Sequence, residues 1–251
     1  MTVPELSVAA WTALVLAAAF VGFAKTAIGG VASLAVVIFA AVLPARESTG
    51  ALLPLLICGD VIAVAIYRRH ANWRLLVRLL PGVIPGLVLG ALFVSWVDDA
   101  TMRRAIAVTL LVMAAVQVRT RTRERRAATA ASAPMSYRGS AAVGTVAGFS
   151  TMAANAAGPV MTLYLILAGL PALELLGTGA WFFLLVNLTK LPFSAGLDLL
   201  RMDTVALDVY LLPLLALGAW LGVVVIRRIE QAQFETAALW LSILAAGLLL
   251  V

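Results

Sequence analysis

Long apolar blocks separated by short polar connections make up most of the chain. Ten such segments can be marked, at roughly 7–24, 28–44, 48–67, 76–97, 102–118, 139–153, 156–170, 174–195, 205–227 and 234–251. A helix needs about 20 mostly apolar residues to cross a bilayer, and these blocks lack the alternation of barrel strands. The pattern therefore predicts an all-α integral membrane protein.

The first two segments of each half are short for a complete crossing. They are interpreted either as full spans or as broken or re-entrant helices at the centre of the fold. The sequence therefore predicts about 8–10 transmembrane helices.

Composition supports a membrane protein and excludes several kinds of site. Hydrophobic residues make up 63% of the chain and charged residues 12%, with a mean hydropathy of +1.07. A soluble domain cannot bury that much apolar surface. Cys58 is the only cysteine and His70 the only histidine, which excludes an internal disulfide and argues against a histidine-built metal site. We expect no metal and no cofactor. No basic residue precedes Lys25, so we expect the first segment to be retained rather than cleaved.

Basic residues are concentrated in every second connection between the apolar segments. Twelve of the 18 Lys and Arg residues lie at 68–78, 119–138 and 227–228, against four in the alternate connections. Those connections are assigned the acids Glu47, Asp98, Asp99, Asp198, Asp203 and Asp208. The positive-inside rule places the Arg-rich side in the cytoplasm and both termini outside a bacterial inner membrane. We interpret the Arg run as a solvated, disordered linker. Nucleic-acid binding is not expected, because no aromatics interleave with the arginines.

Two copies of one unit follow each other along the chain, spaced by about 126–132 residues. The matches are Gly22-Phe23 with Gly148-Phe149, Glu47-x-x-Gly50 with Glu174-x-x-Gly177, Asp60 with Asn187, Pro81 with Pro213, and Gly86 and Gly90 with Gly218 and Gly222. They define a first transmembrane repeat at 1–118, a basic cytoplasmic linker at 119–138 and a second repeat at 139–251. An odd number of segments per half predicts inverted repeats, typical of secondary transporters with a midplane solute site. Four crossings per half would make the repeats parallel.

Each half opens with an apolar stretch interrupted by glycines and small polar residues, at Gly22–Gly30 and Gly148–Pro159. Such residues disfavour a continuous helix, and a broken helix exposes N–H groups at its positive end, which suits an anion. Close helix packing by small residues is the alternative. The substrate-binding candidates in these stretches, lysine aside, are Thr26, Gly29, Gly30, Ser150, Thr151, Asn155 and Gly158.

Charged side chains within apolar segments add further candidates. Lys25 and Lys190 are the only lysines, and either could neutralise an anionic solute on a cavity wall. Asn187 could donate hydrogen bonds to an oxyanion. Asp60 could carry a coupling proton or pair with a lysine. The alternatives are lysines that extend to the membrane interface and a purely structural salt bridge.

The second half contains a long ordered series of recognisable residues. It comprises Gly148–Pro159, Tyr164-Leu165, Gly169–Pro171, Gly177–Phe183 and Asn187–Phe193. In this series the chain resembles the TauE/SafE family of membrane permeases, also called sulfite exporters. The first half resembles the family more loosely: Ile28-Gly29-Gly30 stands where many members have a Gly-rich run followed by proline. The resemblance implies transport of small sulfur-containing anions such as sulfite, sulfonates or thiosulfate.

The combined hypothesis is a secondary transporter for a small anion that works by alternating access, with no catalytic residue. Its partners would be the anion, the lipid bilayer and a coupling proton, and the sequence leaves a homodimer open. An intramembrane enzyme is one alternative, although no H-E-x-x-H, G-x-S-x-G or phosphate-loop motif is present. A membrane assembly factor without a solute is the other, and the lack of any sizeable soluble domain disfavours it.

Overall fold

The ordered elements of the protein are helices throughout the part of the chain that the structure describes. This computed structural model describes residues 6–27, 32–127 and 135–225, together with 240, 243–244 and 246–247. In chain order the elements are α1 (Val8–Thr26), α2 (Ala32–Val42), α3 (Ala45–Tyr67), the 3₁₀ turn η1 (Arg68–His70), α4 (Trp73–Trp96), α5 (Asp99–Ala127), α6 (Tyr137–Ala154), α7 (Gly158–Leu167), α8 (Ala172–Gly196) and α9 (Met202–Val225). These helices follow the first nine predicted segments, and the tenth, 234–251, lies mostly outside the described residues.

The described helices comprise six candidate spans, two short apolar helices, and α6, which has 18 residues but is not apolar enough to count among the spans. Six helices are long and apolar enough to cross a bilayer, namely α1, α3, α4, α5, α8 and α9. Helices α2 and α7 contain 11 and 10 residues. At about 1.5 Å per residue, each covers roughly half of a hydrocarbon core about 30 Å thick. The short helices are thus the second of each half, whereas α1 is long enough to span.

Helix α5 extends into the N-terminal part of the predicted linker. The helix continues to Ala127 and α6 begins at Tyr137, so both enter the range 119–138 assigned to a linker. The interpretation of 119–127 as disordered is wrong, because Arg, Glu and Ala in this run are good helix formers. At the other end of α5, Asp98 accepts hydrogen bonds from Thr101, and these bonds lower the pKa of the Asp98 carboxyl.

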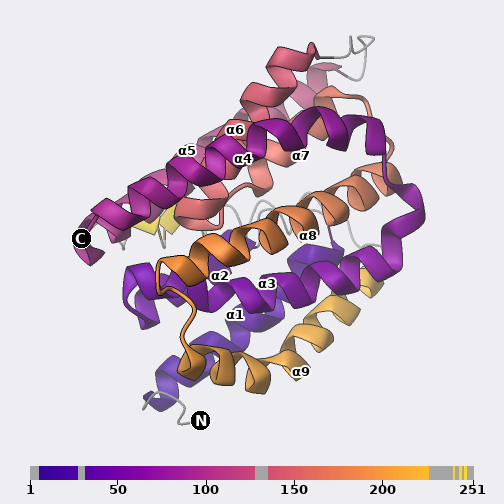
Figure 1. Ribbon diagram of the computed structural model, residues 1–251. Coiled ribbons are helices and arrows are strands. Elements are labelled where there is room, and N and C mark those ends of the chain that lie inside the picture. Colours follow the sequence, from indigo (N-terminus) through magenta and orange to yellow (C-terminus); the bar gives the residue numbers. More distant parts are fainter. Residues whose placement is uncertain are drawn as a thin grey trace.

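Helix pairs from opposite halves build the bundle. Helix α1 packs along α9 and α6 along α4, while α3 and α8 lie between these two pairs (Figure 1). Glycines allow the close approach: a Cβ on Gly22 would lie 1.9 Å from the carbonyl oxygen of Leu215, and one on Gly148 would lie 2.3 Å from that of Val83. Gly22 matches Gly148 in the predicted repeat, and Val83 stands 132 residues before Leu215. The two interfaces therefore use equivalent positions.

Helices α3 and α8 run antiparallel through the centre. Their side chains meet where Asn187 Nδ2 donates a hydrogen bond of 2.7 Å to Asp60 Oδ2. Further along α3, a Cβ on Gly177 would lie 2.7 Å from the carbonyl oxygen of Tyr67. The residue numbers rise on α3 while they fall on α8. Equivalent residues of the two predicted repeats thus contact each other at Asp60 and Asn187.

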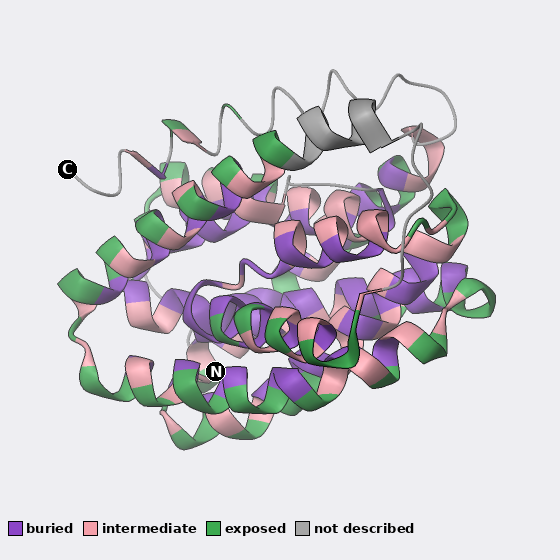
Figure 2. Cartoon of the chain, turned by 90° about the horizontal axis from the view of Figure 1, so that it is seen from above, coloured by how far each residue is buried: buried purple, intermediate pink, exposed green. Residues whose placement is uncertain are grey.

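Apolar side chains cover the outside of the bundle as well as its interior. Figure 2 shows buried residues facing inward on every layer and exposed residues along the outer faces. The exposed large side chains on the two outer helices α4 and α9 include Val77, Ile84, Val88, Leu92, Val209, Leu217 and Trp220. Soluble proteins rarely expose contiguous apolar surface of this extent, so these faces are suited to lipid.

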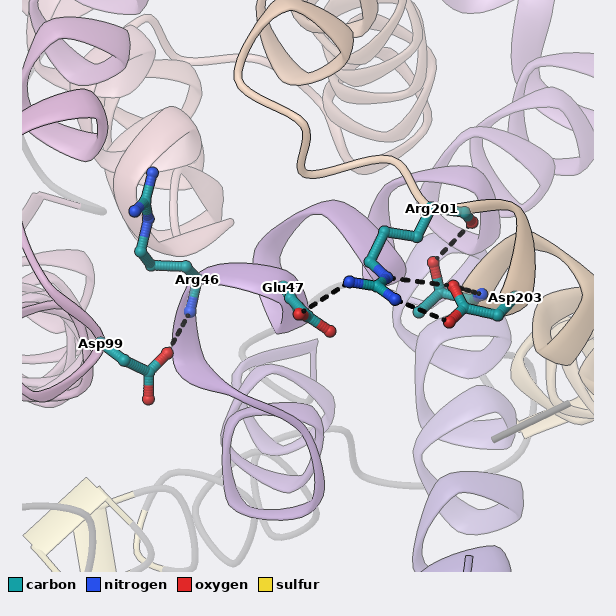
Figure 3. Close-up of polar contacts among 6 residues, drawn as sticks. Arg46, Glu47, Asp99, Arg201 and Asp203 are labelled. Atoms are coloured by element: carbon teal, nitrogen blue, oxygen red, sulfur yellow. Dashed lines mark hydrogen bonds and ion pairs between the residues drawn. The ribbon is translucent and has the colours of Figure 1, made fainter. Parts of the chain in front are cut away.

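Polar connections gather at one end of the molecule. The backbone N–H of Arg46 donates to Asp99 Oδ1 at 3.0 Å, and Arg201 contacts Glu47 at 3.4 Å and Asp203 at 3.2 Å (Figure 3). These residues lie in the first turns of α3, α5 and α9, except Arg201, which lies in the connection before α9. The charge pattern predicts the same, cation-poor side of the membrane for the starts of all three helices.

Candidate anion-binding site

The interruption in the second half is a break between α6 and α7. Asn155 ends α6 in the left-handed conformation, with φ 51° and ψ 29°. Asn tolerates this conformation better than most residues, and Gly158-Pro159 then starts α7 with the proline in its first turn. In the first half, α1 ends at Thr26. Gly29 and Gly30 lie outside the described residues.

A cavity of about 100 Å³ lies between the two interrupted stretches. Its polar lining residues are Lys25, Asp60, Thr151, Asn155, Thr162 and Asn187, and Gly158 adds backbone surface. Leucine, methionine, alanine and phenylalanine side chains form the rest of the wall. A single water needs roughly 10–15 Å³ of such volume, so the space can hold several waters or one small polyatomic anion.

Lys25, Asp60 and Asn187 form the charged centre of the cavity. Lys25 Nζ lies 2.5 Å from Asp60 Oδ1, and Asn187 Nδ2 donates to Asp60 Oδ2 at 2.7 Å. The ammonium also lies 4.5 Å from the centre of the Phe183 ring, within cation–π range. Gly59 makes room for the lysine, because a Cβ there would lie 2.9 Å from Lys25 Cγ. Asp60 is fully buried, so both of its oxygens depend on these two partners.

Lys190 stands behind the cavity wall rather than on it. Its side chain is fully buried and it does not line the cavity. Its ammonium donates to the carbonyl oxygen of Thr151 at 2.8 Å and to Asn155 Oδ1. Asn155 in turn donates to the carbonyl oxygen of Thr49 at 3.0 Å. Lys190 therefore positions Asn155, and no carboxylate among the described residues pairs with it.

The remaining predicted residues have local roles in this structure. Thr26 donates its hydroxyl to the carbonyl oxygen of Ala219 at 2.8 Å, which ties α1 to α9. Ser150 donates to Ala147 within α6 at 3.2 Å. Both side chains are buried and neither lines the cavity. Six predicted residues thus share one cavity, while Thr26, Ser150 and Lys190 support its walls.

The sequence analysis missed one feature of the site and one buried charge in α9. Phe183 lies against Lys25, although its only sequence signal was its place in the family-like run Gly177–Phe183. Asp208 was assigned to a polar connection, and this is wrong: it lies in α9 with 3% of its surface exposed. Its position a few residues inside an apolar segment was the signal that could have placed it there.

Comparison with known protein families gives a match over nearly the whole chain. The family model described as sulfite exporter TauE/SafE matches residues 14–249. Searches of curated proteins and of solved structures gave no match. The match includes both interrupted stretches and the charged centre, and it agrees with a helical bundle with a lipid-suited surface. The chain is therefore a multi-pass membrane protein that belongs to the TauE/SafE sulfite exporter family of transporters.

Proposed function

We propose that the protein is a secondary transporter that binds a small sulfur-containing anion, such as sulfite, a sulfonate or thiosulfate, in the cavity beside Lys25 and moves it by alternating access. Family membership supports the class of protein and of solute. One observation carries the assignment of the site: described residues of both interrupted stretches line a single cavity that also contains the Lys25–Asp60–Asn187 centre. No comparable observation favours an enzyme or an assembly factor.

Charge and backbone geometry both favour an anion here. Lys25 borders the cavity and pairs with Asp60, and the buried Lys190 behind the wall has no carboxylate partner among the described residues. Electrostatic attraction is stronger in the low-dielectric interior than in water. The N-terminus of α7 adds a positive helix dipole beside Gly158, where a Cβ would meet nothing within 4 Å. An anion can therefore approach both Lys25 and the start of α7.

The repeats at 1–118 and 139–251 are proposed to be inverted, with the segment between them in the cytoplasm. The antiparallel course of α3 and α8, with equivalent residues in contact at their crossing, supports this arrangement. The cavity extends from the centre to Leu175 and Leu176 in the first turns of α8, beside the arginines of η1. By the positive-inside rule this end is cytoplasmic, and both termini are outside a bacterial inner membrane.

Asp60 is proposed to couple a proton to the anion. In the structure its carboxylate neutralises Lys25. When Asp60 accepts a proton, Lys25 loses its counter-ion and becomes available to the anion. Proton and anion then bind together, and each raises the affinity of the site for the other. This mechanism predicts symport of one proton with each anion.

Uptake by purified protein in proteoliposomes tests the proposal. Labelled sulfite, thiosulfate and a short sulfonate are offered with and without a pH gradient, and a thermal-shift screen measures binding of the same anions. We expect uptake of at least one anion, its loss in Lys25→Met, and uptake by Asp60→Asn that no longer responds to the gradient. Absence of both uptake and thermal stabilisation for every anion would refute the function. An unchanged response to the pH gradient in Asp60→Asn would refute the coupling alone.

A further inference from the structure

Both repeats line the cavity near the charged centre, but away from it some lining residues of the second repeat have counterparts in the first repeat that do not line it. Gly179 and Leu175 line it on α8. Their equivalents, 127 residues earlier, are Leu52 and Ser48 on α3, with 1% and 2% of their surface exposed. On α7, Leu165 lines the cavity, whereas the residue 126 positions before it on α2 is a fully buried phenylalanine. The same positions thus line an open space in one repeat and a packed core in the other.

The charged centre contains a pair of equivalent residues from the two repeats. Asp60 and Asn187 are equivalent residues that contact each other, and both line the cavity. Leu56 and Phe183, also 127 residues apart, both line it as well. An anion beside this centre would therefore lie between the open space along α8 and the packed positions along α3. If each repeat adopted the conformation that the other has now, the positions along α3 would open and the space along α8 would close.

An ion pair between the repeats covers the packed side. Glu47 lies in the first turn of α3, directly before Ser48, and contacts Arg201 in the connection between α8 and α9 at 3.4 Å (Figure 3). Arg201 also contacts Asp203, which belongs to its own repeat. The equivalent of Glu47 is Glu174, in the first turn of α8, where the open cavity ends.

We propose that α2 and the first half of α3 form a second anion vestibule, which is closed in this structure, and that the Glu47–Arg201 ion pair holds it closed. This inference rests on the proposed transport function and specifies the path by which the anion leaves the charged centre. The vestibule is lined by the equivalents of the open cavity, including Ser48 and Leu52.

The exposure of the ion pair is suited to a contact that must break in every cycle. The side chains of Arg201 and Glu47 are 52% and 33% exposed. Exposed pairs of this kind are weak and are screened by salt, so its loss should shift the ratio of closed to open forms by about fivefold at most. The contact can therefore bias the closed form without trapping it.

Cysteine accessibility tests the inference with a matched pair of reporters. In a Cys58→Ser background, Gly179→Cys reports the open cavity and Leu52→Cys the closed vestibule. The Gly179 site has room, since an added Cβ meets only Leu165 Cδ1 at 4.0 Å. A membrane-impermeant methanethiosulfonate reagent is added separately to right-side-out and to inside-out membrane vesicles. We expect Gly179→Cys to react from one face, and Leu52→Cys to react slowly and only from the opposite face.

Breaking the ion pair should then change one reporter selectively. Glu47→Gln and Arg201→Gln should each raise the labelling rate of Leu52→Cys by about two- to fivefold. Asp203→Asn is the control, because it removes a contact within one repeat and leaves the ion pair between repeats. Ser48→Cys is a second reporter of nearly native size, which covers the case in which Leu52→Cys does not fold.

The outcomes separate this inference from the proposed function. If Gly179→Cys reacts and anion uptake persists, but neither vestibule reporter accelerates in Glu47→Gln or Arg201→Gln, the inference is wrong and the transport function stands. Reaction of both reporters from the same face of the membrane would also refute the inference and leave the transport function standing. Absence of anion uptake and of anion-induced thermal stabilisation in every background would overturn the proposed function itself.

Discussion

Lys25→Met removes the cation that pairs with Asp60 while keeping a side chain of similar length. Asp60 is fully buried and would retain only the hydrogen bond from Asn187. Removing one partner of a buried ion pair costs about 3–5 kcal/mol, because the other charge is left without compensation. Lys25 is 9% exposed and borders the cavity, so we take the lower end, about 3 kcal/mol.

That loss is large enough to measure in detergent-solubilised protein. One kcal/mol corresponds to about 2–4 °C for a chain of this size, so Lys25→Met should lower the melting temperature by about 6–12 °C. The double variant Lys25→Met with Asp60→Asn should recover most of the loss, because asparagine brings no charge into the bundle. Arg201→Gln is the control: it removes only exposed ion pairs, with Glu47 and Asp203, and should lower the melting temperature by no more than about 2–4 °C. A small effect of Lys25→Met, or strictly additive losses in the double variant, would refute the buried ion pair.

Two further substitutions test the packing and the cavity wall. Gly148→Ala should destabilise the protein by about 1–3 kcal/mol or more, because its Cβ would lie 2.3 Å from the carbonyl oxygen of Val83, whereas Gly196→Ala meets nothing within 4 Å and should be tolerated; thermal unfolding compares them. Lys190→Met should weaken anion binding by about tenfold although Lys190 does not line the cavity, because Asn155 loses the charged donor that positions it; unchanged affinity in titrations would contradict this.

Helices and their interruptions could be predicted because both depend on local sequence. Continuous apolar runs define the spans, and Asn155 followed by Gly158-Pro159 marks the break between α6 and α7. The repeat also gave the correspondence of Asp60 with Asn187. In the structure these two residues form the crossing of α3 and α8.

The partners of the charged residues could not be predicted, because they depend on how helices are placed in space. Lys25 and Asp60 lie on different helices, and spacing along the chain does not show that they meet. Spacing gives the helix face of Lys190 but not its depth, so its place behind Asn155 was missed. The contact of Glu47 with Arg201 depends in the same way on the meeting of two distant connections.

The structure of the protein with a selenium oxyanion bound, such as selenite in place of sulfite, tests the central claim most directly. Selenium scatters anomalously, so its position is found independently of the surrounding atoms. We predict a selenium peak inside the cavity, within reach of Lys25 Nζ and the N-terminus of α7. A peak found only on the protein surface, with the cavity empty of anion at saturating selenite, would contradict the account.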